Sequence, residues 1–443
     1  MEEEKSNEKC KIASFSSEKL RRKSEETVFQ SLNKKNTGDD ASWKSVERES
    51  KRRRREVNEI FINNDVLEEI MTRLPVKTLI RFQAVSKDWR HIITSSSFKE
   101  RYLLHQKTLE PKFLCIYEDK SWYMPNFALK TMSLEWSSTC LVDEEEEYHI
   151  SNEHEELILL VSRSLDGLFC LCSGADLTRP INVINPATRC SWTLPLSKTQ
   201  LNNSLDNNKV QFPRPGLGKD LPGLGKDYVT GTYKLVWLQN IDNTSSCEVF
   251  DFGAKQWRPV IPPHQIEYDQ APTFVNGWLY WFSQDNTKFV AFDLHMEVFH
   301  IVPNPVIHES SSKFVDLHME SADDDRRLVW MSKTNGDGLQ HIWRLTNHNN
   351  TGGILSIVDK MFTFDLNKIN PTWFDSHFSS PLKVMAISKN TDKVMLSRSY
   401  SQNLLLFQPL NPISIRYRIF SYSPSRPSDS FVLPYFPSLI SPL

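Results

Sequence analysis

The stretch DVLEEIMTRLPVKTLIRFQAVSKDW, residues Asp65 to Trp89, is the most clearly patterned part of this 443-residue chain. Asp65 precedes apolar residues at helical spacing, and its carboxylate can accept hydrogen bonds from the free amides of a first helical turn. Pro75 ends that helix, because proline excludes the α conformation from the residue before it. Ser86 is a good cap for a further helix that carries Trp89. The stretch therefore predicts three short helices.

Apolar side chains in this stretch exceed what a unit of about forty residues can cover internally. An apolar patch left open on a small helical unit is normally an interaction site. Packing against the domain that follows is the alternative, and the spacing alone leaves both open. The residues concerned are Leu67, Ile70, Leu74, Leu79, Val85 and Trp89.

The segment from Ile62 to about Leu104 resembles an F-box of the large plant F-box superfamily. RLPVKTLIRF at 73–82 and VSKDWR at 85–90 match its two most characteristic stretches, and SSSF at 95–98 is similar to its closing Ser-Pro-x-Phe. The resemblance implies docking onto a Skp-type adaptor, which would link the chain to a cullin–RING ubiquitin ligase. The residues that it assigns to this docking are Ile62, Leu67, Ile70, Leu74, Pro75, Leu79, Val85 and Trp89.

Two positions depart from the F-box pattern. The usual opening Leu-Pro is Ile62-Asn63 here, and the closing proline is Ser97. The first departure is expected to weaken the leading edge of the adaptor interface. The second affects only a turn.

The leader, residues 1–58, is rich in Lys, Glu, Ser and Asn and nearly free of aromatics. Such a composition cannot bury enough apolar surface to offset its ordering entropy, so we expect disorder. A dense basic run within it is a candidate nuclear import signal, the alternative being a solvated charge run. Its residues are Lys51, Arg52, Arg53, Arg54 and Arg55, and they favour the nucleus within an expected location in the nucleus, the cytoplasm or both.

Overall composition narrows the class of protein. The net charge is −2, which gives no reason to expect a direct nucleic-acid partner. The 7 cysteines form no C-x-x-C pair, which disfavours disulfide frameworks and zinc sites and favours a reducing compartment. No window reaches the roughly twenty apolar residues of a membrane span, so no membrane partner is expected.

From Lys112 onward the pattern changes to short apolar runs bounded by Gly, Asn, Asp or Pro. Asp166-Gly167 and Asn276-Gly277 are dipeptides that supply the positive φ of hairpin turns. Many short strands at this spacing predict an all-β sandwich, barrel or propeller.

A repeat decides among these three architectures. Each copy is an apolar strand that ends in Asn or Asp, then a polar turn, an aromatic and usually a proline. Clear copies end their strands at Asn185, Asp251 and Asp293, and weaker ones at Asp365 and Gln408. Two of the spacings between the strand ends of successive copies match the ~40–45 residues of a four-stranded propeller blade. We therefore predict a β-propeller of about five to seven blades.

Where the spacing between successive copies is longer than one blade, the chain must contain an insertion or an extra loop. The polar stretch from about Thr199 to Lys226 holds a near-tandem duplication, PGLGKDL at 215–221 and PGLGKDY at 222–228, and is predicted to be an insertion. Asn347 to Gly353 is predicted to be an extra loop. The resulting fold class is α plus all-β, with these domains: disordered leader 1–58, F-box helical domain 59–106, β-propeller 111–420 and Pro/Ser-rich tail 421–443.

The β region also resembles the plant F-box-associated (kelch-like) domain. SLDGLF at 164–169, INPAT at 184–188 and VNGWLYW at 275–281 are similar to its recurring phrases. The paired glycines of kelch repeats are absent apart from Gly352-Gly353. In that family the β domain captures the substrate, so the resemblance implies an unknown protein target.

No catalytic constellation emerges from the sequence. GLGKD lacks the glycine spacing and the hydroxyl of a phosphate loop, and His154-Glu-Glu lacks the second histidine of a zinc-protease helix. We expect no catalytic residue, metal or cofactor. The predicted function is substrate adaptor of a Skp–cullin–F-box ubiquitin ligase. The alternatives are a propeller enzyme or small-ligand or glycan binder, and an F-box scaffold acting outside the ligase.

Overall fold

The computed structural model describes residues 63–441 with gaps, and the chain divides into two units, residues 1–67 and 68–443. The gaps are 120–125, 136–139, 144–147, 152–158, 174–177, 206–220, 242–243, 264–270, 284–286, 308–316, 322–327, 335–338, 348–352, 366–381, 389–392, 399–402, 409–416 and 422–429. The predicted leader, its basic run Lys51–Arg55 and Ile62 lie outside the described residues.

In the described residues four helices precede the strands, and they are α3 (Asn64–Thr72), α4 (Val76–Phe82), α5 (Lys87–Thr94) and α6 (Ser96–Thr108). The predicted cap of the first helix, Asp65, is wrong. Asn63 takes that role, since its Oδ1 accepts a hydrogen bond from the Asp65 amide at 3.2 Å. Asp65 lies in the first turn instead, where its carboxylate faces the positive end of the helix dipole.

The other helix boundaries follow the predicted residues. Pro75 precedes α4 in an extended conformation, with φ −60° and ψ 147°. Ser86 caps α5 by accepting from the Trp89 amide at 3.0 Å, as predicted. Ser95 caps α6 in the same way, accepting from the Phe98 amide at 3.2 Å. These side chains satisfy amides that a helix leaves open at its start.

Six antiparallel sheets follow in the described part of the chain. The first contains β25 (Ser430–Tyr435), β1 (Lys112–Asp119), β2 (Asn126–Glu135) and β3 (Cys140–Asp143), with β4 (Tyr148–Ser151) also paired to β2. The second contains β5 (Leu159–Val161), β6 (Phe169–Ser173), β7 (Asn182–Asn185) and β8 (Cys190–Thr193). The third contains β9 (Gly223–Lys226), β10 (Tyr233–Ile241), β11 (Thr244–Asp251) and β12 (Gln256–Val260).

The remaining three sheets repeat the same order. They contain β13 (Thr273–Val275), β14 (Trp278–Phe282), β15 (Lys288–Asp293) and β16 (Val298–Pro303); β17 (Leu317–Ser321), β18 (Leu328–Thr334), β19 (Leu339–Asn347) and β20 (Leu355–Asp365); and β21 (Leu382–Ile387), β22 (Val394–Arg398), β23 (Asn403–Phe407) and β24 (Tyr417–Ser421). The helices α7 (Lys198–Leu205) and η1 (Pro305–Ile307) lie in connections between strands.

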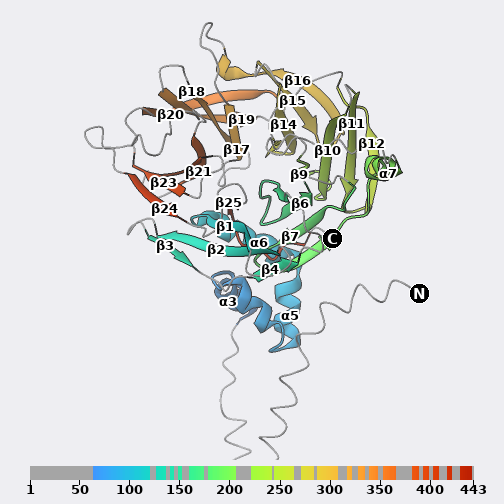
Figure 1. Cartoon of the computed structure of the whole chain (residues 1–443). Helices are drawn as coiled ribbons and strands as arrows, with labels where there is room; N and C mark the ends of the chain where they lie inside the picture. The colour runs from blue at the N-terminus through green and yellow to red at the C-terminus, as the bar shows by residue number, and fades with distance from the viewer. Residues whose placement is uncertain are drawn as a thin grey trace, which may run out of the picture. The chain divides into compact units, whose positions relative to one another are not determined.

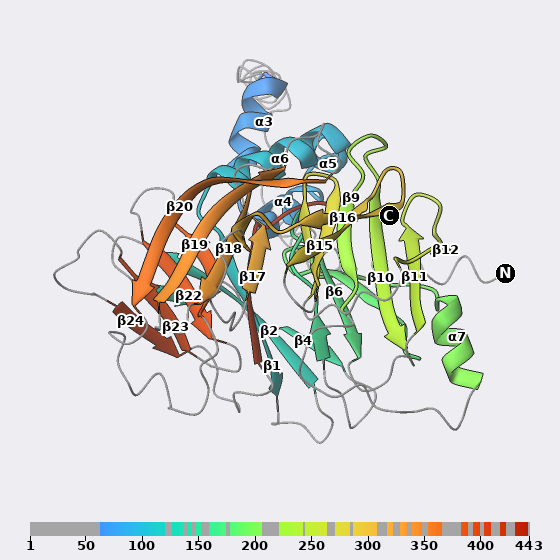
Figure 2. The ribbon, with the colours of Figure 1, turned by 90° about the horizontal axis from the view of Figure 1, so that it is seen from above.

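Figure 1 shows these sheets following one another around a ring, with β9, β17 and β25 toward its centre. Figure 2 shows β17 to β20 lying side by side as one sheet and β9 to β12 as another. Each sheet is therefore one blade, and the described strands form a six-bladed propeller, within the predicted range.

The C-terminal segment belongs to the propeller, so the predicted tail at 421–443 is wrong for most of its length. β25 pairs antiparallel with β1, with Val432 opposite Cys115. Residues 435–440, at its end and beyond it, are buried. Pro434 made this segment read as a tail, but β25 is the terminal strand of its sheet, where proline is tolerated.

The predicted insertion also contains a strand. Gly223–Lys226, in the second copy of the duplication, is β9, the first strand of the third blade. A Cβ on Gly223 would lie 2.7 Å from Cγ of Pro272, and one on Gly225 would collide with the Leu294 side chain. The glycines that looked like a loop therefore permit close packing against the next blade.

The repeat corresponds to the turn between the third and fourth strands. Asp251 Oδ1 accepts from the amides of Gly253 and Ala254 at 2.8 and 3.0 Å, and Asn185 and Asp293 do the same in their blades. The copy anchored at Asp365 is wrong, because Asp365 ends the fourth strand β20. The matching position there is Asn347, at the end of β19.

Candidate partner-binding surface of the helical segment

The helical segment has a small core of its own. Its buried side chains are Met71, Val76, Leu79, Ile93, Phe98, Tyr102 and Leu103. Leu79 is 0% exposed, so its predicted place in an adaptor interface is wrong. The i,i+3 pair that faces inward is Val76 and Leu79, and Leu79 is therefore part of this core.

Three large aliphatic side chains of residues 68–94 face outward from this segment. Ile70 is 47% exposed, Ile80 38% and Val85 62%. Pro75 is exposed as well, while Leu74 and Trp89 are half-buried. Leu67, in the unit of residues 1–67, is half-buried. Ile70, Pro75, Ile80 and Val85 together are called here the open apolar surface.

Ile80 was missed by sequence reasoning. It follows Leu79 directly and lies four residues after Val76. Helical spacing places Ile80 on the same face as the buried Val76, so no local pattern in the sequence indicates that it is exposed.

Hydrogen bonds and ring contacts hold the segments that carry this surface. The Tyr102 hydroxyl donates to the Leu74 carbonyl at 3.1 Å, which fixes the turn before Pro75. Burial raises the pKa of Tyr102, so its phenol stays protonated. The Val85 amide donates to the Phe82 carbonyl at 3.0 Å. The Phe82 and Trp89 rings pack with their centroids 4.9 Å apart.

Burial and hydrogen bonding thus divide the predicted residues into two groups. Ile70, Pro75 and Val85 are presented on ordered backbone, and Leu74 and Trp89 support them with part of their own surface exposed. An apolar side chain that is held in place and exposed can be covered by a partner without the cost of ordering it first.

Strand histidines and tryptophans have structural surroundings where they are described. Trp257 packs on Trp237 and Phe250, and His300 packs edge-on against Trp278. Among the described residues no group of three or more His, Cys, Asp or Glu is arranged to hold a metal ion.

Two family models match the chain. The F-box domain matches residues 62–101, and the F-box associated beta propeller domain matches residues 121–442. Together with the fold they define the class, an F-box followed by an F-box-associated propeller. The chain belongs to the plant F-box proteins that carry an F-box-associated β-propeller.

Similar proteins come from Arabidopsis thaliana. A probable F-box protein is 51% identical over 42% of this chain and 87% of its own length. A putative F-box/kelch-repeat protein is 35% identical over 68% of this chain and 71% of its own length. A further F-box protein is 32% identical over 86% of this chain and 85% of its own.

Within the described residues, no helix has the length and apolar character needed to cross a membrane.

Proposed function

We propose that this protein is the substrate-recognition subunit of a Skp–cullin–F-box ubiquitin ligase. The F-box would bind a Skp-type adaptor through the open apolar surface, and the propeller would hold a protein target. Ubiquitin transfer would then rest on proximity, since the complex supplies the ubiquitin-charged enzyme. In this proposal no residue of the chain performs chemistry, and no cofactor takes part.

The observation that carries the proposal is the exposure of Ile70, Ile80 and Val85 in a segment that matches the F-box model. Fully burying a side chain of this type stabilises a complex by roughly 1.5–3 kcal/mol. The propeller does not cover these residues, although it buries most of those of its aromatic side chains that the structure describes. The open apolar surface is therefore best explained as the binding site of a partner protein.

Co-purification tests the proposal. The intact tagged chain, expressed in plant cells, is expected to retain a Skp-type adaptor and a cullin. Ile70→Asp combined with Val85→Asp places two charges where apolar contact is needed, and should reduce recovery of both proteins by at least about tenfold.

Ile301→Asp is the matched control. Ile301 is similarly exposed, at 56%, but lies on β16 of the propeller. It should leave recovery of the adaptor unchanged. If the intact chain retains neither protein, a scaffold outside the ligase becomes the better description; equal recovery with the folded double variant refutes the assigned surface.

We also propose that the basic run Lys51–Arg55 directs part of the protein to the nucleus. Its support is composition alone, five consecutive cations ahead of the F-box. In a fluorescent fusion, Gln at all five positions should lower the nuclear fraction, and an unchanged fraction would refute the signal.

A further inference from the structure

The Asp166-Gly167 turn of the propeller, between β5 and β6, contacts α6, the last helix before the strands. Asp166 is buried with a positive φ of 52°, and its Oδ1 accepts from Lys107 Nζ of α6 at 2.6 Å. Its Oδ2 accepts from the Tyr233 hydroxyl of β10 at 2.8 Å, and its backbone carbonyl accepts from Ser438 Oγ at 2.6 Å. We call Lys107, Asp166, Tyr233 and Ser438 the Asp166 cluster.

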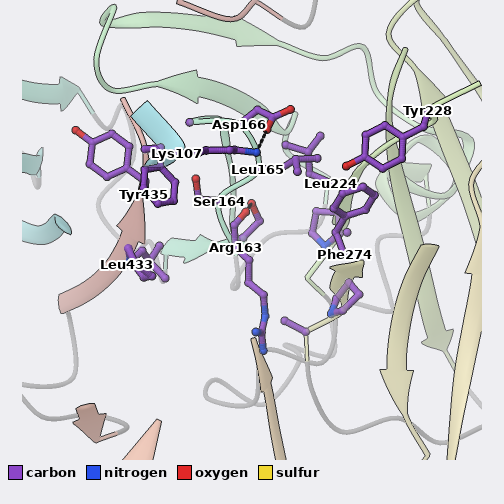
Figure 3. A pocket seen from close by; sticks show the side chains of 18 residues that line it. Lys107, Arg163, Ser164, Leu165, Asp166, Leu224, Tyr228, Phe274, Leu433 and Tyr435 are labelled. Carbon is purple, nitrogen blue, oxygen red and sulfur yellow. Dashed lines mark hydrogen bonds and ion pairs between the residues drawn. The ribbon is translucent and has the colours of Figure 1, made fainter. Parts of the chain in front are cut away.

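Figure 3 shows the Lys107–Asp166 pair in the wall of a cavity of about 70 Å³ that is also lined by Leu224, Phe274 and Leu433. Both charged side chains are largely removed from water, at 17% and 4% exposed. Burial alone would raise the pKa of Asp166, yet Lys107 and Tyr233 hold it below its ordinary value. The Asp166 carboxylate is therefore charged, and it lies in a low-dielectric setting beside Lys107.

Neighbouring contacts leave the turn little freedom to move. A Cβ on Gly167 would lie 2.7 Å from both the Phe436 carbonyl oxygen and Ser438 Oγ, so the turn and the C-terminal segment are in close contact. On α6 itself, Leu103 is packed in the same apolar cluster as Leu165 and Phe436. Just beyond α6, the Ser388 hydroxyl donates to Glu110 Oε1 at 2.9 Å.

These contacts differ in how strictly they define the direction of α6. Leucine packing tolerates small rotations and slides of a helix, because dispersion is not directional. A buried ion pair does not, since separating the charges leaves an uncompensated charge in the interior. Within the described contacts of α6, the Lys107–Asp166 pair joins the helix to the propeller by opposite charges that are both largely buried.

We propose that Lys107 and Asp166 are positioning residues that lock α6 to the propeller in one orientation. The inference rests on the proposed function: with the F-box held by the adaptor, this orientation decides where a bound target faces the ubiquitin-charged enzyme. The pair itself touches neither the adaptor surface nor any reacting atom.

Distance measurement in the full chain tests the lock. Spin labels at Lys87 on α5 and Lys288 on β15, both exposed, report the separation of helical segment and propeller. The parent chain should give one narrow distribution. Lys107→Met and Asp166→Asn should each broaden it at least about twofold, and the double variant no further, because all three remove one shared interaction.

Two variants separate positioning from general stability. Lys107→Arg keeps the charge and should restore a narrow distribution. Asp359→Asn makes the same carboxylate-to-amide change in the exposed Arg344–Asp359 pair of the fifth blade, and should leave the distribution narrow. An unchanged distribution in folded Lys107→Met and Asp166→Asn overturns the inference, as does lower melting temperature without broadening.

The outcome is separable from that of the proposed function. None of these substitutions alters the open apolar surface, so every variant should still co-purify with the adaptor as the parent chain does. Failure of the parent chain to bind the adaptor counts against the ligase proposal and leaves the distance result intact. Normal adaptor binding with unchanged distances counts against the positioning pair alone.

Discussion

Asn185 shows how one side chain can serve both a local turn and a distant segment. Its Oδ1 accepts from the Ala187 and Thr188 amides, and its Nδ2 donates to the carbonyls of Ser438 and Ile440 at 3.1 and 3.0 Å. The residue is fully buried. Aspartate would keep the acceptor but replace the donor with a buried, unpaired charge.

Asn185→Asp is therefore expected to lower the free energy of unfolding by about 3 kcal/mol or more at neutral pH, measured by denaturant titration. Asp293→Asn is the control, because Asn keeps the oxygen that accepts from the His295 and Met296 amides. It should change stability by less than about 1 kcal/mol. Equal stability of Asn185→Asp and the parent chain would show that the C-terminal segment is not held by this amide.

At the scale of secondary-structure elements, strand β25 closes the ring of blades. It forms the free edge of the first sheet beside β1, and its end and the residues after it fill the apolar clusters that contain Phe436, Ile440 and Tyr435. Without it, β1 becomes an open edge and both clusters lose side chains, which favours aggregation.

A chain that ends at Asp429 should accordingly fail to give soluble monomer in size-exclusion chromatography. Adding a peptide of residues 430–443 during refolding should recover part of it. A chain that ends at Ser441 keeps every buried residue of the segment and serves as the control. Soluble, folded monomer from the shorter chain would contradict the role given to β25.

Much of the local structure was predictable from residue chemistry. Pro75, Ser86 and the Asn or Asp at the strand ends of the repeat affect only backbone within a few residues of themselves. Their effect on local structure can therefore be predicted from the sequence. The edges of the propeller were not predictable in the same way. β9 reads as a glycine loop and β25 as a proline tail until the strands that flank them are known.

Helical segment and propeller share a core within residues 68–443, which has a consequence for the whole molecule. Leu103 of α6 is 2% exposed and belongs to the largest apolar cluster of the propeller. We therefore expect α6 and the blades to unfold together, in one cooperative step, when followed by hydrogen exchange.

Leu103→Ala should destabilise α6 and the second blade alike by about 2–5 kcal/mol. Leu104→Ala is the matched control, because this neighbour on the same helix is 52% exposed and its truncation should change stability by less than about 0.5 kcal/mol. Selective loss of protection in α6, with the blades unaffected, would show that the helix is merely laid against the propeller.

The sequence by itself determined the helices after Asn63, their caps, the repeated strand-and-turn unit and the class of fold, because these depend on neighbours in the chain. Only the tertiary structure decided that Leu79 is covered while Ile80 is open, that β25 closes the ring, and that Lys107 meets Asp166. Each of these depends on a contact between residues whose proximity no local pattern encodes, since a side chain carries no mark of the distant surface that will bury it.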